Sequence, residues 1–249
     1  MPYRRLPNTD QARLRALKNA LAIAMKTPLS ELAFSQINLS RMQAFTPSFE
    51  QVVAQHRRAR KNQGDKSKNY NELLKKARLY VSHFIQVMNF AIIRGELKPH
   101  VREFYGLNKH DKSVPVFKHD SDVIDWGKKV IEGEQERTRM GEGSAIYSPS
   151  IAVVKVHYEE YVDAYRHQKM LQSITARASE KVAELREEAD TLILNVWNEV
   201  EEKFVDLPDE EKRKEAAKYG VIYFYRPKER KKIAAQKLQT NIPFGAENN

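Results

Sequence analysis

Apolar residues recur along most of this chain at intervals of three and four, the spacing that gathers them on one face of an α-helix. The first such run follows an N-cap pair, Thr9-Asp10, and ends near Met25. Similar runs continue almost to the C-terminal segment. The pattern predicts helices over residues 10–25, 29–45, 47–62, 70–94, 99–105, 122–140, 149–172, 175–204 and 208–219.

Polar or proline-containing segments separate these runs and predict turns. Thr46-Pro47 and Ser148-Pro149 each resemble an N-cap followed by a first-turn proline. The polar stretch 61–69 and the shorter segment 172–175 are expected to be turns between helices. The first of these turns would make residues 47–94 a helical hairpin.

The order of these signals is similar in the two halves of the chain and suggests a duplication. Three short matches support it, at offsets of 109, 112 and 114 residues: Phe49-Glu50 with Tyr158-Glu159, Glu72-Leu73 with Glu184-Leu185, and Tyr105-Gly106 with Tyr219-Gly220. The two proline caps lie 102 residues apart and conflict with this alignment, and amphipathic helices share such matches by coincidence. We predict an all-α fold of two tandem, duplicated helical bundles: a basic unit over 1–112, an acidic unit over 113–225 and a basic arm over 226–249.

One run, Val221–Tyr225, has the composition of a β-strand. Two interpretations are open for it. It could pair with Val114–Phe117 in the polar linker that joins the two expected units, or it could cover the end of a bundle.

The composition, with 41% hydrophobic and 31% charged residues, is that of a globular chain. The chain has no cysteine, which excludes disulfides, thiolate metal sites and cysteine nucleophiles. The N-terminal residues lack the apolar run of a secretory signal, and no segment approaches the roughly 18 apolar residues that a bilayer span requires. We therefore expect a soluble, cytoplasmic protein with no membrane partner.

The net charge of +10 is unevenly distributed along the chain. Residues 1–115 carry 21 Lys+Arg against 8 Asp+Glu, whereas residues 116–225 carry 16 against 23. Either the two halves attract each other, within a chain or between chains, or the basic half binds an anionic partner.

Most motifs of catalytic or cofactor chemistry are missing from the sequence. It contains no glycine-rich phosphate loop, no Glu-x-x-His of a di-metal bundle and no Gly-x-Ser-x-Gly elbow. We expect no cofactor, no metal and no catalytic residue that can be named, and the enzyme hypothesis is left without support.

A few histidines are weak candidates for metal binding or acid–base chemistry. His157 and Glu160 are one helical turn apart, and His100, His110 and His119 lie in or near the linker. A solvated polar face is the alternative for all of them. His83 lies in the most apolar predicted helix, where we expect it to be buried.

Basic clusters are the remaining functional signal. If 61–69 is a turn, nine cations converge at the tip of a hairpin and could bind phosphates or an acidic surface: Arg57, Arg58, Arg60, Lys61, Lys66, Lys68, Lys75, Lys76 and Arg78. A solvated, lysine-rich bundle end is the competing interpretation. The second cluster, in the C-terminal arm, consists of Arg226, Lys228, Arg230, Lys231 and Lys232.

These observations lead to three hypotheses. The first is a non-enzymatic helical interaction or scaffold protein that binds an unidentified acidic protein surface or associates with itself. The second is nucleic-acid or ribosome binding through the hairpin tip and the arm. The third is a small-ligand or enzymatic site between the two bundles, near Trp126, Tyr147 and Trp197.

Overall fold

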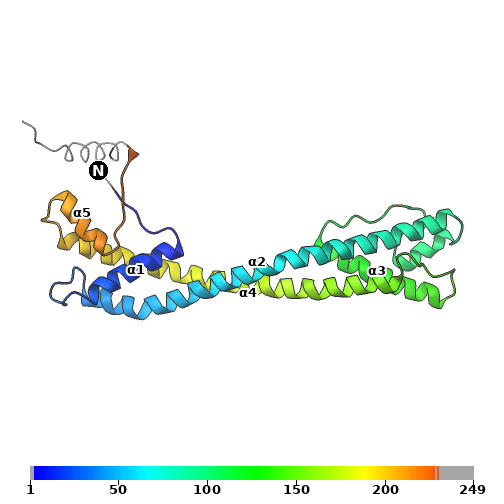
Figure 1. Ribbon diagram of the computed structural model, residues 1–249, viewed down its shortest axis with the longest axis horizontal. Coiled ribbons are helices and arrows are strands. Elements are labelled where there is room, and N and C mark those ends of the chain that lie inside the picture. The colour runs from blue at the N-terminus through cyan, green and yellow to red at the C-terminus, as the bar shows by residue number, and fades with distance from the viewer. Residues whose placement is uncertain (1–2, 228, 230–249) are drawn as a thin grey trace, which may run out of the picture. The chain divides into compact units, whose positions relative to one another are not determined.

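The computed structural model describes residues 3–227 and 229 and has the expected all-α fold, with one short β pairing (Figure 1). Its elements in chain order are β1 (Tyr3–Arg4), α1 (Asp10–Ala24), α2 (Gln36–Ile93), the 3-10 helix η1 (Pro99–Tyr105), α3 (Asp120–Arg139), α4 (Ile151–Lys203), α5 (Asp209–Lys218) and β2 (Tyr223–Phe224). The predicted N-cap is confirmed at α1, where the Ala12 amide donates to the Thr9 hydroxyl at 3.2 Å.

Helix α2 is continuous over 58 residues, so the predicted turn at 61–69 and the hairpin are wrong. Residues 61–69 are polar but contain no proline, and nothing in them prevents helical hydrogen bonding. Pro47 lies inside the helix instead of starting one. It removes one backbone hydrogen bond, while Phe45 and Phe49 beside it are buried, with stacked rings 5.5 Å apart.

Helix α4 is also continuous, and the predicted turn at 172–175 is likewise wrong. Thr175, the last residue of this segment, donates its hydroxyl hydrogen to the Leu171 carbonyl oxygen at 3.0 Å. The hydroxyl is therefore satisfied inside the helix and does not interrupt it.

The chain forms two compact units whose boundaries differ from the sequential ones expected. Unit 1 combines residues up to Arg57 with those from Arg177 onward, and unit 2 consists of Arg58–Ala176. Because α2 and α4 do not break, each helix contributes one part to each unit. Neither the 1–112 unit nor the 113–225 unit coincides with a compact unit, and the tandem duplication stays a prediction.

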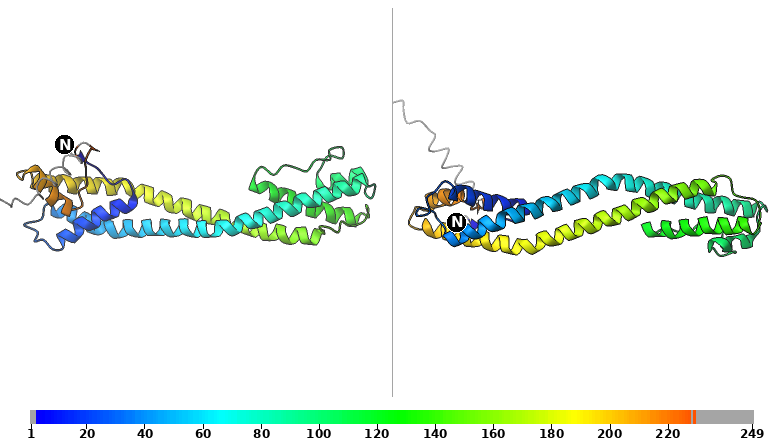
Figure 2. Two further views of the ribbon diagram at one scale, coloured as in Figure 1. Left: turned by 45° about the horizontal axis from the view of Figure 1, so that its top comes forward. Right: turned by 90° about the horizontal axis from the view of Figure 1, so that it is seen from below.

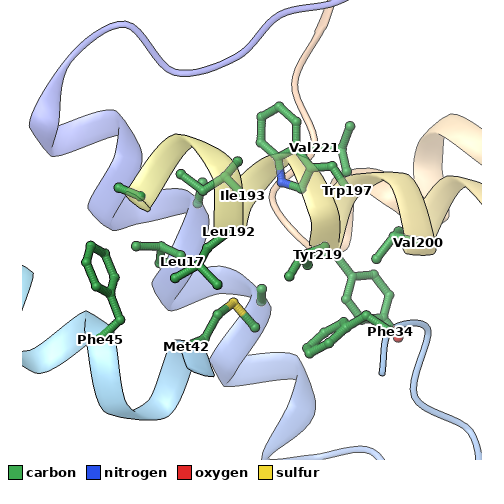
Figure 3. Packing of buried hydrophobic residues seen from close by; sticks show 14 of the residues in the cluster. Leu17, Phe34, Met42, Phe45, Leu192, Ile193, Trp197, Val200, Tyr219 and Val221 are labelled. Carbon is green, nitrogen blue, oxygen red and sulfur yellow. The ribbon is translucent and has the colours of Figure 1, made fainter. Parts of the chain in front are cut away.

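The core of unit 1 is built from α1, the first part of α2, the last part of α4 and the segment after α5 (Figure 3). Trp197 is its largest buried side chain, and the Phe34 ring meets the Tyr219 ring edge-on at 6.0 Å. Other buried members are Leu17, Met42, Leu192, Ile193, Val196, Val200 and Val221.

The strand-like run pairs with the N-terminus and not with the linker. Tyr223 and Phe224 of β2 lie opposite Arg4 and Tyr3 of β1 in an antiparallel register. The Tyr3 and Phe224 rings approach to 5.8 Å. The alternative partner, Val114–Phe117, belongs to unit 2 and forms no strand.

Ion pairs within unit 1 join the N-terminal part of the chain to the last part of α4, and in two of the three the N-terminal part supplies the cation. Arg13 donates to both carboxylate oxygens of Asp190 at 2.8 Å, and Arg186 donates to both of Asp10 at 2.8 and 2.9 Å. Arg4 pairs with Glu201 at 2.9 Å. The unlike halves of the sequence therefore attract each other within the chain, one of the two expected explanations of the uneven charge.

In unit 2, η1 and α3 pack against the last part of α2 and the first part of α4 (Figure 2). The side chains of Val81, Phe84, Val101, Val130 and Val154 share one buried cluster. A second, smaller cluster surrounds Tyr70, Ala77, Val123 and Tyr161.

Two buried arginines fix the loops of unit 2. Arg137 forms an ion pair with Glu134 at 2.7 Å and donates to the carbonyl oxygens of Glu142 and Ser144 at 2.6 and 3.0 Å. Arg102 donates to the carbonyl oxygen of Asn108 at 2.8 Å. Each of these hydrogen bonds compensates for the hydration that the guanidinium loses on burial. The loops are therefore held by charged groups whose hydrogen-bond donors have partners.

Candidate functional site

The nine cations expected at a hairpin tip lie along continuous α2 instead. They extend over 22 residues, with roughly 32 Å of helix between the first and the last. Arg57 is the last residue of its segment in unit 1, and the others, from Arg58 to Arg78, belong to unit 2. They do not converge on one point, so the geometry that would have gathered phosphates at a tip is not formed.

Three of these residues form a straight row on the solvent face of α2. Lys61, Lys68 and Lys75 are exposed and spaced by seven residues, which is about two turns and roughly 10.5 Å per step. Tyr70 and Ala77, on the opposite side of the helix, are buried. We call these three residues the lysine row.

Most of the basic residues have no carboxylate partner in the described part of the chain. No carboxylate oxygen lies within 4.0 Å in the described residues for any of eight exposed cations: Arg57, Arg58, Arg60, Lys61, Lys66, Lys68, Lys75 and Lys76. Elsewhere on α3 and α4, exposed lysines such as Lys128 and Lys155 pair with a glutamate one turn away. Asp65 and Glu72 are exposed in the same stretch, so the basic part of α2 carries eight exposed cations against two carboxylates and has a net positive charge.

Arg78 differs from the other eight because it is half-buried. The amide of His119 is the main cause that lowers the pKa of Asp122, and the positive charge of Arg78 contributes to the same effect. Arg78 therefore interacts electrostatically with a carboxylate of its own unit, and it does not belong to the exposed basic surface.

No aromatic ring is exposed among the basic residues. Tyr70 is buried, and its hydroxyl donates to an Asp120 carboxylate oxygen at 2.6 Å. Burial raises its pKa, and the hydrogen bond to Asp120 raises it further. The tyrosine ring is committed to the core of unit 2, and stacking on single-stranded bases has no support at this surface.

The structure describes only part of the C-terminal arm. Arg226 is exposed, and its backbone amide donates to a Glu229 carboxylate oxygen at 2.9 Å. Lys228, Arg230, Lys231 and Lys232 lie outside the described residues.

Two carboxylates of α4, Glu199 and Glu201, have hydrogen-bond partners within unit 1. Glu199 accepts from the amide and the hydroxyl of Ser35, just before α2. Glu201 accepts from Arg4 and from the Tyr223 hydroxyl.

The expected burial of His83 is wrong, because α2 turns this side chain toward solvent next to Leu79. His157 stacks on Tyr80, with ring centroids 4.3 Å apart, and lies 3.3 Å from Glu160. These contacts anchor the histidine against its neighbouring helix.

The three linker histidines have different environments. His100 contacts Glu142 at 3.1 Å, His119 occupies the N-cap of α3, and His110 is exposed. Within residues 3–227 and 229, no three histidine or carboxylate side chains are grouped in a way that could hold a metal ion.

The three aromatic residues of the third hypothesis do not share a pocket. Trp197 is buried in the core of unit 1. Trp126 belongs to unit 2, is half-buried and carries the Lys129 ammonium 4.4 Å from its ring centroid. Tyr147 is 81% exposed.

The sequence did not indicate the open hollows beside α2 in unit 2, of which two are lined in part by Tyr147. One, of about 600 Å³, is lined by Leu79, His83, Tyr147 and Val153. The other, of about 380 Å³, is lined by residues that include Val87, Ala91, Leu97 and Ile146, again with Tyr147. One residue in the sequence could have indicated the larger hollow. Leu79 is apolar but does not fall on the helix face that contains the buried residues Ala77 and Val81.

Comparison with protein-family models, with curated proteins and with solved structures finds no match to this chain. In the described part of the chain, no helix combines the length and the hydropathy that crossing a bilayer requires.

Proposed function

We propose that this chain is a cytoplasmic, non-enzymatic interaction protein that binds an acidic protein surface through the exposed basic part of α2. The observation that carries the proposal is the set of eight exposed cations without a carboxylate partner, centred on the lysine row. Like charges so close together repel each other. An acidic partner relieves that repulsion and adds charge-assisted hydrogen bonds.

The shape of the surface favours a protein partner over a nucleic acid. A row that follows one helix face presents charges at roughly 10.5 Å steps, whereas duplex phosphates follow a curved path with much closer spacing. No exposed ring accompanies the row for base stacking, because Tyr70 is buried. Nucleic-acid binding is therefore the alternative outcome of the test.

Fluorescence anisotropy of the full-length protein with two labelled probes tests the proposal: a 20-residue polyglutamate peptide and an RNA hairpin, each at low and high salt. We expect the peptide to bind, and we expect salt to weaken the binding. The variant Lys61→Gln/Lys68→Gln/Lys75→Gln should weaken binding by about tenfold or more, since each exposed ion contributes on the order of 0.5 kcal/mol.

A matched control removes three positive charges elsewhere in unit 2. The variant Lys109→Gln/Lys128→Gln/Lys155→Gln has the same net charge, and we expect it to bind within about twofold of the unaltered protein. Equal losses in the two variants would show that only net charge matters. Tight binding of the RNA without binding of the peptide would replace the proposal with nucleic-acid recognition.

A further inference from the structure

The solvent face of α2 continues beyond the lysine row and becomes apolar. Leu79, Phe90 and Ile93 are 62%, 57% and 58% exposed, although each is a large hydrophobic side chain on a regular helix. Single exposed apolar residues are common, but three on one face of one helix make a patch that is typical of a binding surface.

The basic and apolar residues share one helix face. In order they are Lys61, Lys68, Lys75, Leu79, Gln86, Phe90 and Ile93, and the steps between them are seven, seven, four, seven, four and three residues. Asp65 and Glu72 lie on the same face between the lysines, and His83 lies between Leu79 and Gln86. Steps of three, four and seven keep side chains on one side of an α-helix, and the same spacing forms the seam of a helix–helix interface. We call this set the outer face of α2.

Features of unit 2 border the apolar part of the outer face on both sides. At one edge, Asn89 donates to the Lys112 carbonyl oxygen at 3.0 Å, which holds the linker beside the helix. At the other edge, Val87 and His83 line the hollows of about 380 and 600 Å³, and Tyr147 lines both. Leu79 also lines the larger hollow, which therefore adjoins the apolar part of the outer face.

We infer that the outer face of α2 binds an amphipathic helix of another protein. That helix would place carboxylates along the lysine row and apolar side chains against Leu79, Phe90 and Ile93. The inference rests on the proposed function and adds the form of the partner. The net positive charge of residues 57–76 sets which end of the partner is acidic, and Leu79, Phe90 and Ile93 set which end is apolar.

A second copy of α2 does not fit this surface. Parallel pairing of two outer faces would oppose lysine to lysine. Antiparallel pairing would oppose Lys61 to Ile93 and so bury ammonium groups against apolar side chains, which is costly.

The acidic side of α4 in unit 1 matches only half of the outer face. Glu180, Glu184 and Glu187 are exposed there and could oppose lysines, but the same side continues through the polar residues Thr191 and Asn198. It offers nothing to cover Leu79 and Phe90. A different protein, acidic at one end and apolar at the other, is the better match.

Two synthetic helical peptides of about 33 residues test the inference with the full-length protein. In the first, glutamates at seven-residue spacing and leucines further along the helix share one face. In the second, of identical composition, the leucines are moved to the opposite face. We expect the first peptide to bind at least tenfold more tightly, because only it buries apolar surface against α2.

Two variants identify the surface. Leu79→Ser/Phe90→Ser/Ile93→Ser should abolish the difference between the peptides while leaving polyglutamate binding unchanged. The control Val116→Ser/Met140→Ser/Val156→Ser removes three other exposed apolar side chains from unit 2 and should preserve the difference.

The outcomes separate the inference from the function on which it rests. Equal binding of the two peptides, still lost in the lysine-row variant, overturns the helical partner but keeps the acidic one. A lack of binding to any acidic peptide overturns both. Self-association in light scattering that the Leu79, Phe90 and Ile93 substitutions abolish makes a second copy the occupant and also overturns the inference.

Discussion

At the scale of single residues, unit 2 depends on a charge that is buried and fully partnered. Burial by itself would lower the pKa of Arg137, but the hydrogen bond that it donates to the Glu134 carboxylate and the nearby Tyr105 raise it. Glu134 also accepts from the Tyr105 hydroxyl and from the Ile146 amide. Arg137, Glu134 and Tyr105 are hydrogen-bond partners of one another. The loss of one side chain therefore leaves a buried charged or polar group without its partner.

Removing the guanidinium tests this interdependence. We expect Arg137→Leu to lower the free energy of unfolding by about 3–5 kcal/mol, because the Glu134 carboxylate would stay buried without its partner. Urea denaturation followed by circular dichroism measures it. Arg139→Leu, which removes an exposed arginine two residues away, should leave the free energy of unfolding nearly unchanged.

The double variant Glu134→Leu/Arg137→Leu provides the second check. It removes both charges, and we expect it to be more stable than Arg137→Leu alone. If the single arginine variant is as stable as the unaltered protein, the buried network is not what holds the loop after α3.

In unit 1, Asp10 predicts a dependence on pH. The hydrogen bond from Arg186 lowers its pKa, against the opposing effect of burial, and the charges of Arg186 and Arg13 add to the lowering. A carboxyl whose pKa is lower in the folded state stabilises the protein above its unfolded pKa of about 3.9. This stabilisation is lost as the pH falls through the folded value.

We therefore expect Asp10→Asn to destabilise the protein by about 1–3 kcal/mol at pH 7, the range for hydrogen bonds to charged groups. The difference from the unaltered protein should shrink as the pH falls below 4. Urea titrations from pH 7 to pH 3 measure it, with Asp163→Asn, an exposed carboxyl, as the control. A difference that is constant over this range would contradict the assigned ion pair.

At the scale of the elements, the continuity of α2 is the main feature that local sequence reasoning missed. The run 61–69 lacks buried apolar residues, and Gly64 within it suggests a break. The buried residues Val53 and Tyr70 on either side nevertheless lie in the same helix. Helix propensity is a weak signal, and contacts with the rest of each unit decide whether such a run bends.

Substitutions at Gly64 test whether residues 61–69 form a helix or a turn. Nothing lies within 4 Å of a Cβ atom built at this position, and its backbone does not have a positive φ. Gly64→Ala should therefore raise the free energy of unfolding by about 0.5–1 kcal/mol, and Gly64→Pro should lower it by about 3 kcal/mol. In a turn the proline variant would be tolerated, so a small effect of Gly64→Pro in urea denaturation would restore the hairpin.

Several elements were predictable because their signals are local. The cap at Thr9, the proline start of η1 at Pro99 and the glycine stop at Gly106 are confirmed at their residues. The partner of β2 was not predictable, because it lies about 220 residues away in sequence. The basic residues were found from composition, but their arrangement as a row depends on a helix that the sequence does not show to be continuous.

The outer face of α2 illustrates the same limit for function. Leu79, Phe90 and Ile93 belong to the most apolar predicted helix, where the sequence alone does not separate core from surface. Their exposure follows from the phase set by Val81, Phe84 and Met88, which are fully buried. The apolar part of the candidate site is visible only once that phase is known.

At the scale of the whole molecule, the order of the chain differs from the order of its compact parts. Unit 2 is one continuous stretch, Arg58–Ala176, whereas unit 1 needs both ends of the chain. The same arrangement brings parts of opposite net charge together, since Arg4 and Arg13 near the N-terminus pair with Glu201 and Asp190 of α4 in one unit. Basic and acidic halves of the sequence are thus not two separate bodies.

This organisation predicts which fragments fold. A fragment of residues 58–176 contains both buried clusters of unit 2, so we expect it to be helical and to unfold cooperatively. A fragment of residues 1–112 keeps Leu17 and Met42 but loses Leu192 and Trp197, which pack against them, so it should show no cooperative transition. Circular dichroism and urea denaturation of the two purified fragments decide the matter. Cooperative unfolding of 1–112 without that of 58–176 would favour tandem units instead, because a duplicated bundle must hold its own core within a continuous half of the chain.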